Sequence, residues 1–425
     1  MNKRTISTFI LLSVFIVVSA LLIAYAKGVR PDFKNGKIQT TGLLVATSNP
    51  DGASVYVNDH LTTATNTTIN LNPGDYRVRI IKEGYLPWQK NLKIQKEIVT
   101  KTDATLFPST PELKPLTVNG ALNPTLSPDA AKIVYAVLPQ TNTNQTEQDR
   151  AGLYVLDLYD RPLSLSRSTR RIAKNTINYD FSKAKLLWSP DSKFLLALFI
   201  NEQKSGPALK RNAVEILKNT EINPNDVNTA ILIQADTENP SKDITPTLSI
   251  ILKQWKVEQQ AKYHDQLLSL PAEFQQIATT SMSLLKFSPD ETKILYEATA
   301  SARLPIIINP PLIGTNTQPE DRELKPKTTY VYDIKEDKNF RVDKTPRTTL
   351  LSDLIWFPDS KHFIFVENNA ISTIEYDMTN KMTVYAGPFE DSYIFPWPNG
   401  SKVVILTTLN KSAGETPNLY SLGLK

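Results

Sequence analysis

The sequence predicts a mainly β protein that begins with one apolar helix, and three observations lead to this prediction. An uncharged apolar run occupies residues 6–26, short alternating runs separated by turn residues occupy 42–94, and a turn motif built on proline recurs from residue 126 onward. A chain of 425 residues with 40% hydrophobic and 21% charged residues can bury sizeable cores, so we expect two or three globular domains.

The N-terminal segment has the features of a membrane span. Lys3 and Arg4 precede the uncharged residues 6–26, and about 20 apolar residues at 1.5 Å each cross the hydrocarbon layer of a bilayer. The alternative is a cleaved signal peptide, because residues 24–26 read Ala-Tyr-Ala, but the apolar core of such a peptide usually has only about 7–15 residues. We therefore expect an uncleaved transmembrane helix, with residues 1–5 in the cytoplasm and the rest of the chain outside.

Composition excludes several classes of function. The formal net charge of +5 is small for this length, and basic residues alternate with acidic ones, so a nucleic-acid partner is not expected. The absence of cysteine excludes disulfides, thiolate nucleophiles, Cys-type metal sites and a lipid-modified cysteine.

Residues 42–107 predict a small β domain that follows a linker at 27–41. Val55 and Val57 alternate with other residues, as Val78 and Ile80 do, which is the period of a strand with one buried face. Proline, glycine and asparagine lie between these runs and favour tight turns.

This segment resembles the PEGA domain, a small β-sandwich named for a Pro-Glu-Gly-Ala turn. Two positions depart from the family pattern: Asn58-Asp59 replaces the usual Asp-Gly turn, and Thr65-Asn66-Thr67 stands where Thr-Pro is common. The resemblance implies a module of the extracytoplasmic cell envelope, without catalytic residues. It is carried by residues in the family order, namely Pro50, Asp51, Gly52, Ala53, Gly74, Tyr76, Gly84 and Tyr85.

The proline turn motif recurs five times, and an apolar strand begins shortly after each copy. Proline fixes φ in the turn, and the following Asp or Asn accepts backbone N–H bonds, so the motif predicts a turn between two strands. Paired acids of such repeats could act as a glycosidase pair, but residues that recur because a turn needs them are expected to be structural. The motif residues are Pro128, Asp129, Trp188, Pro190, Asp191, Pro289, Asp290, Trp356, Pro358, Asp359, Trp397 and Pro398.

Residues 108–425 resemble the TolB-like, or WD40-like, propeller repeats. These repeats carry an aromatic-Ser-Pro-Asp-Gly turn and then an Ile-Tyr-Val-x-Asp strand, which residues 152–157, 329–333 and 418–422 fit. The motif prolines are 62, 99, 69 and 40 positions apart, whereas propeller blades repeat at about 40–50 residues. The resemblance therefore implies a β-propeller of about five or six blades, most of them with insertions.

Two insertions stand out. Residues 246–280 predict a helical hairpin: a helix over 246–270 with apolar positions that include Trp255 and Tyr263, then a short helix after Pro271. We expect its apolar face to pack on the propeller, the alternative being a partner-binding flap. The second insertion, residues 302–326, is rich in proline. With Trp255 it supplies the candidates for a contact surface, which are Arg303, Asn309, Pro310 and Pro311.

No catalytic motif, metal site or cofactor site is evident. The three histidines lie in different units and are expected on the surface, and no nucleophile elbow or phosphate-binding loop is present. We expect no enzyme activity and no cofactor. The sequence predicts a membrane-anchored extracytoplasmic binding or scaffolding protein of the cell envelope, with an envelope protein or a cell-wall glycan as partner. The alternatives are an extracytoplasmic hydrolase acting on glycans or peptides, and the ectodomain of a sensory complex.

Overall fold

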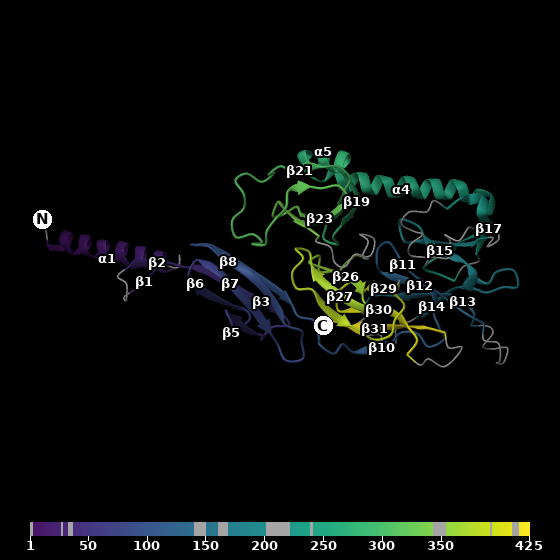
Figure 1. The fold of residues 1–425 in the computed structure, drawn as a ribbon, viewed down its shortest axis with the longest axis horizontal. Coiled ribbons are helices and arrows are strands. Elements are labelled where there is room, and N and C mark those ends of the chain that lie inside the picture. The colour runs from purple at the N-terminus through teal and green to yellow at the C-terminus, as the bar shows by residue number, and fades with distance from the viewer. Residues whose placement is uncertain are drawn as a thin grey trace.

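The computed structural model describes residues 3–26, 29–32, 37–139, 150–159, 169–200, 222–238, 241–342, 354–391, 393–409 and 416–425 (Figure 1). Along the chain these residues form an N-terminal helix, a β-sandwich and a larger domain of five four-stranded sheets with a helical insertion. The helix lies at one end of the molecule and the larger domain at the other, with the sandwich between them (Figure 1).

The N-terminal helix α1 (Lys3–Ala26) carries exposed apolar side chains, such as Leu11 at 72% and Phe15 at 68% exposure. No helix in the described part of the chain combines the length and the apolarity that a membrane crossing requires. The expected linker at 27–41 contains a two-stranded hairpin, β1 (Val29–Asp32) and β2 (Lys37–Thr40).

The sandwich consists of two sheets. One has the order β6-β3-β9, in which β3 and β9 are parallel, and the other has the order β5-β4-β7-β8. Val55, Val78, Ile80 and Trp88 are buried between them. The strands are β3 (Gly42–Asn49), β4 (Ser54–Val57), β5 (His60–Ala64), β6 (Thr67–Leu71), β7 (Gly74–Ile81), β8 (Trp88–Ile94) and β9 (Val99–Thr105).

The larger domain contains five antiparallel four-stranded sheets, here called blades 1 to 5. Blade 1 comprises β11 (Leu122–Leu126), β12 (Lys132–Val137), β13 (Gly152–Asp157) and β14 (Thr169–Lys174), and blade 2 comprises β15 (Lys185–Trp188), β16 (Phe194–Ile200), β17 (Val227–Gln234) and β18 (Lys242–Asp243). Blade 3 comprises β19 (Met282–Phe287), β20 (Lys293–Ala298), β23 (Thr328–Asp333) and β24 (Lys338–Arg341), and blade 4 comprises β25 (Ile355–Trp356), β26 (His362–Glu367), β27 (Ala370–Glu375) and β28 (Met382–Tyr385).

Blade 5 joins the two ends of the larger domain. Its strands β29 (Ile394–Pro396), β30 (Lys402–Thr407) and β31 (Asn418–Gly423) come from the C-terminus, and its fourth strand, β10 (Leu113–Pro115), comes from the start of the domain. Because β10 pairs with β31, blade 5 holds together chain segments about 300 residues apart in sequence. The count of five blades lies within the predicted range of five or six.

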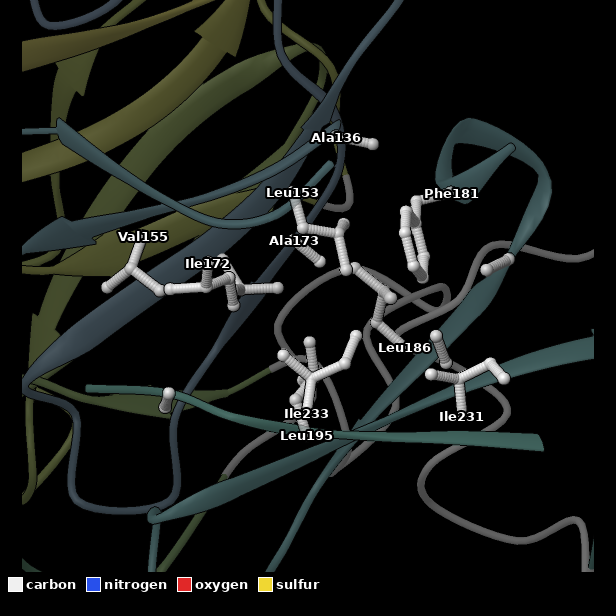
Figure 2. Close-up of a cluster of buried hydrophobic side chains, with 14 of the residues drawn as sticks. Ala136, Leu153, Val155, Ile172, Ala173, Phe181, Leu186, Leu195, Ile231 and Ile233 are labelled. Carbon is white, nitrogen blue, oxygen red and sulfur yellow. The ribbon is translucent and has the colours of Figure 1, made fainter. Parts of the chain in front are cut away.

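Hydrophobic clusters show which blades pack on each other. Blade 1 packs on blade 2, and Figure 2 shows Leu153, Val155 and Ile172 beside Leu195 and Ile233. Other clusters join blade 3 to blade 4, blade 4 to blade 5, and blade 5 to blade 1. The blades are therefore packed in the order 3-4-5-1-2, which is a propeller-like arrangement.

The helical insertion lies where blades 2 and 3 would otherwise meet. It consists of α4 (Leu248–Leu268) and α5 (Ala272–Ser281), and Figure 1 shows α4 running from the side of β17 to the side of β19 and β21. Leu248 and Trp255 at the start of α4 pack on blade 2, whereas Phe274 of α5 packs on blade 3. Among the described residues, no hydrophobic cluster joins blade 2 directly to blade 3.

The five proline motifs lie between the first and second strands of the five blades, and they share one backbone geometry. In each, the residue after the Asp or Asn has a positive φ: 56° at Ala130, 60° at Ser192, 56° at Glu291, 58° at Ser360 and 66° at Gly400. Ala130 N–H also donates to the carbonyl of Ser127 at 2.8 Å, which closes the turn. A turn followed by a left-handed residue is a common three-residue hairpin loop, and glycine is the residue that tolerates it best.

Four blades therefore place a residue with a side chain where glycine would be unstrained. We predict that Ala130→Gly raises the free energy of unfolding by about 1 kcal/mol, because the left-handed conformation is costly for alanine. Urea unfolding of the purified chain measures the change. Ala136→Gly, a substitution of a buried residue inside β12, is the matched control and should lower stability. Equal destabilisation by both substitutions would contradict this account of the turn.

Candidate functional site

In the first three motifs the serine and the aspartate bind each other. Ser189 Oγ donates to Asp191 Oδ1 at 2.6 Å and accepts the backbone N–H of Phe194 at 2.9 Å. Ser288 makes the equivalent bonds to Asp290 and Lys293, at 2.7 and 2.9 Å. Each serine is thus fully engaged in joining two strands, and its aspartate has no histidine partner, so these pairs have the geometry of a turn.

Hydrogen bonds also link the turn of one blade to the turn of the next. Ser192 Oγ of blade 2 accepts the backbone N–H of Asp129 in blade 1 at 3.1 Å, and Ser360 Oγ of blade 4 accepts that of Asp290 in blade 3 at 3.1 Å. At the equivalent position of blade 3, Glu291 accepts instead from Gln266 Nε2 of α4 at 2.9 Å. In blade 3 this turn residue therefore binds the inserted helix α4 and not the turn of blade 2.

In the fourth motif Phe357 stands where the first three motifs have serine, and the aspartate, Asp359, pairs with His362. His362 Nδ1 lies 2.7 Å from Asp359 Oδ2, and the ring of Phe107 meets the imidazole edge to face. The expectation that the histidines lie on the surface is wrong for His362, whose side chain is only 1% exposed. Burial alone would lower the pKa of His362, but the carboxylate of Asp359 outweighs this effect and raises it. The His362–Asp359 pair orders the turn of blade 4 in the way that the Ser-Asp pairs do in blades 1 to 3.

The structure does not bring the five candidate contact residues together. Trp255 is half-buried against blade 2, whereas the other four belong to the insertion that leaves blade 3 through β21 (Ala302–Arg303) and returns through β22 (Glu323–Leu324). Arg303 is exposed and pairs with Glu323 at 3.3 Å. Asn309, Pro310 and Pro311 are exposed.

The proline-rich insertion is fixed at its base. Asp337 Oδ2 accepts the backbone N–H groups of Ile307 and Ile308 at 2.7 and 3.0 Å, and Arg322 Nη1 donates to the carbonyl of Pro305 at 2.6 Å and to Asp337 Oδ1 at 3.2 Å. The insertion nevertheless leaves apolar side chains in solvent, since Ile306 is 57% and Ile313 78% exposed.

A buried polar site lies at the junction between the sandwich and blade 4. Lys90 of β8 reaches from the sandwich to two carboxylates of blade 4: its Nζ lies 2.8 Å from Glu375 Oε2 and also pairs with Asp377. The side chains of Lys90 and Glu375 are each 10% exposed and that of Asp377 is 0% exposed. The ion network is therefore almost completely shielded from water.

Further hydrogen bonds use the remaining acceptor sites of these carboxylates. Trp88 Nε1 and Asn380 Nδ2 donate to Glu375 Oε1 at 2.5 and 2.9 Å. Asn316 Nδ2, from the proline-rich insertion, and Thr379 Oγ1 donate to Asp377, both at 2.6 Å. A buried charge is tolerated when it is paired and hydrogen-bonded in this way.

The pKa shifts of Lys90 and Asp377 agree with an ionised network. Burial would lower the pKa of Lys90, but the nearby carboxylates of Glu375 and Asp377 outweigh it and raise the pKa. Burial would raise the pKa of Asp377, but the Lys90 ammonium and the donated hydrogen bonds lower it.

Glu375 and Asp377 are a pair of carboxylates that converge outside the turn motif, which is what an acidic hydrolase site would require. Both bind the same lysine and neither presents an open face to solvent, so the arrangement holds two domains together. Among the described residues, no group of three or more His, Asp or Glu side chains is placed to hold a metal ion.

Sequence reasoning missed this junction, although it contained one signal. Lys90 follows Trp88 and precedes Leu92 at the period of a strand, so it lies on the apolar face of β8. A charge on a buried face requires a partner. The identity of that partner, 285 residues away, has no local signature.

Apolar contacts extend the same junction. Phe107, the residue that ends the sandwich, is 0% exposed and packs edge to face on Phe357 of blade 4, with ring centroids 6.0 Å apart. The backbone N–H of Leu86 donates to the carbonyl of Phe107 at 2.7 Å, so the connection to the larger domain is held against the sandwich.

Residues 41–110 match the PEGA domain, which confirms the prediction made for this segment. The chain therefore combines a PEGA domain with a propeller-like domain of five blades. No curated protein matches it.

Solved structures with some similarity include TolB from Acinetobacter baumannii, at 13% identity over 96% of this chain and 68% of that chain, with a TM-score of 0.22. The β-propeller domain of the Trilobed protease from Pyrococcus furiosus has 13% identity over 90% of this chain and 96% of that chain, with a TM-score of 0.21. Oligogalacturonate lyase from Vibrio parahaemolyticus has 10% identity over 82% and 86%, with a TM-score of 0.27. The propeller-like arrangement rests on the strand order and packing of this chain itself.

We predict that Lys90→Met lowers the free energy of unfolding by about 3–5 kcal/mol, because it leaves two buried carboxylates without their cation. Denaturant unfolding followed by tryptophan fluorescence measures the loss, and Trp88 reports directly on the junction. Lys93→Met is the matched control, since Lys93 lies on the exposed side of the same strand. Equal stability of the two variants would show that the ion network does not hold the junction.

The turn of blade 3 predicts a pH dependence. Burial would raise the pKa of Asp290, but hydrogen bonds from Ser288 and Thr292 lower it to about 2. Since the folded pKa lies below the usual 3.8, the contribution to stability is full above pH 4 and is lost as the pH falls toward 2.

We therefore predict that Asp290→Asn is less stable than the parent chain at pH 7 by about 1 kcal/mol, a value reduced for solvent screening. The difference should shrink between pH 4 and pH 2, as measured by urea unfolding at each pH. Asp51→Asn, which removes an exposed carboxylate in the sandwich, serves as the control. A deficit that is the same at pH 7 and pH 2 would contradict the assignment.

Proposed function

We propose that this chain is an extracytoplasmic binding or scaffold protein of the cell envelope, attached to a membrane by its N-terminal segment and without enzymatic activity of its own. The observation that carries the proposal is the buried junction of Lys90, Glu375 and Asp377, which joins the PEGA domain and the propeller-like domain as one unit. Such a unit suits a protein that presents a binding surface at a fixed place.

Membrane attachment is supported by the surface of α1. Its exposed side chains include Leu11, Phe15 and Leu22, at 72%, 68% and 63% exposure. Exposed apolar groups of this density are stabilised by contact with lipid or with another apolar surface. The PEGA domain lies between α1 and the blades (Figure 1), so it would set the distance of the blades from the membrane.

A protein or glycan of the envelope is the partner that we propose. The exposed apolar side chains of the proline-rich insertion favour a protein: Ile306, Leu312 and Ile313 are 57%, 47% and 78% exposed, while Arg322 and Asp337 hold the backbone beside Ile306. A fixed loop that presents apolar side chains loses little entropy on binding.

The localisation is tested with the full chain carrying a C-terminal tag. We expect the protein in the membrane fraction, and we expect protease added outside intact spheroplasts to degrade the tag. Leu11→Arg with Phe15→Arg should release the protein from the membrane, whereas the neutral change Ser13→Ala should not. Recovery of the parent chain in the cytosol, or protection of the tag from external protease, would overturn the proposal.

A further inference from the structure

The two ends of α4 pack on the blades, whereas its middle is exposed. Its first turns pack on blade 2 through Leu248, Leu252 and Trp255, and its last turn contributes Leu267 to the cluster of blade 3. Between these ends, every side chain from Lys256 to Asp265 is exposed. The middle of a 21-residue helix, about 30 Å long, therefore bridges blades 2 and 3 with its outer side in solvent.

A regular stripe of residues lies on the side of α4 opposite its packed face. The positions alternate by four and three residues, which is the spacing of the contact seam of a coiled coil. Three of them are large and apolar, with Ile250, Val257 and Leu268 at 65%, 57% and 55% exposure. All six are exposed, and they are Ile250, Gln254, Val257, Ala261, His264 and Leu268.

Charges on the two flanks of this stripe differ in sign. One flank carries Lys253 and Gln260, and the other carries Glu258 and Asp265. When two such helices pair in parallel, a residue on the first flank meets the residue five positions further along on the second flank of its partner. Lys253 then meets Glu258 of the other copy. In an antiparallel pair, Glu258 would instead face Glu258 of the other copy, which is repulsive.

We propose that α4 is a self-association surface, on which two copies of this chain pair side by side with their α4 helices parallel. The occupant of the stripe is a second copy because the flanking charges are complementary to the same helix in parallel register. In Figure 1 α4 runs along the long axis of the molecule, with α1 at one end. Two copies anchored in one membrane would both present α4 in this direction, an argument that rests on the proposed function. The argument from the flanking charges is independent of the proposed function.

Site-directed disulfide cross-linking tests the proposal on the full chain in detergent, because the chain has no cysteine of its own. Val257→Cys should form a covalent dimer on mild oxidation, since residue 257 of one chain faces residue 257 of the other across a parallel seam. Gln259→Cys, which is also at an exposed position but on the opposite side of α4, should remain monomeric. His264→Cys repeats the test at a second seam position in case Val257→Cys folds poorly.

Two results would overturn the proposal. One is the absence of cross-linking at both seam positions. The other is cross-linking only when Ile250→Cys and Leu268→Cys chains are mixed, which would indicate an antiparallel pair.

Charge reversal gives an independent readout. Lys253→Glu alone and Glu258→Lys alone should each weaken dimer formation roughly tenfold, as measured by sedimentation, because each turns two attractive contacts per dimer into repulsive ones. The double variant Lys253→Glu with Glu258→Lys should restore the parent affinity. Failure of the double variant to recover would contradict the pairing, while its recovery cannot come from a merely structural role of either residue within one chain.

Discussion

The ion network around Lys90 is the constraint on which the arrangement of this molecule depends. Three charged side chains, Lys90, Glu375 and Asp377, are removed from water, and such groups are stable only when the surrounding donors and acceptors are all in place. Trp88, Asn316 and Thr379 supply those donors from three different parts of the chain. A small rotation of the PEGA domain would break several of these bonds together, so its orientation on blade 4 is fixed.

The helical insertion is the second feature that determines the architecture. Four of the five places where blades could meet are filled by direct apolar packing, and the fifth is occupied by α4 and α5. Glu291, in the turn of blade 3, accepts a hydrogen bond from Gln266 of α4, which ties the insertion to this blade. In the described part of the chain, the apolar contacts of α4 with the blades lie near its two ends, and the side chains between them are exposed.

Local structure was predictable from the sequence because it is determined by nearby residues. The five turns follow from proline and from the side-chain oxygen of the next residue, and the strands of the PEGA domain follow from alternation and from Pro50, Gly52 and Gly84. The helices after residue 246 were also expected, but Tyr263 is 41% exposed where a packed apolar face was predicted. A helix that bridges two blades has the same periodicity as one that lies on a surface, so the sequence does not distinguish them.

Long-range contacts were not predictable. Nothing near Lys90 identifies Glu375, and nothing near Leu113 identifies Leu422, its partner in blade 5. His362 was expected on the surface because a lone histidine usually lies there, yet its burial depends on Phe107, a residue of the other domain. The candidate contact residues follow from helix periodicity at Trp255 and from proline-rich composition at the other four, and the structure places them in two separate insertions.

The distance between the two domains tests the central claim most directly. Pulsed electron paramagnetic resonance measures this distance between spin labels on Leu61→Cys in the PEGA domain and Val118→Cys near blade 5. Both positions are exposed, and the chain has no other cysteine. A junction fixed by Lys90, Glu375 and Asp377 gives one narrow distribution, which broadens when Lys90→Met is added. A distribution that is already broad in the parent chain would contradict the claim that the two domains form one unit.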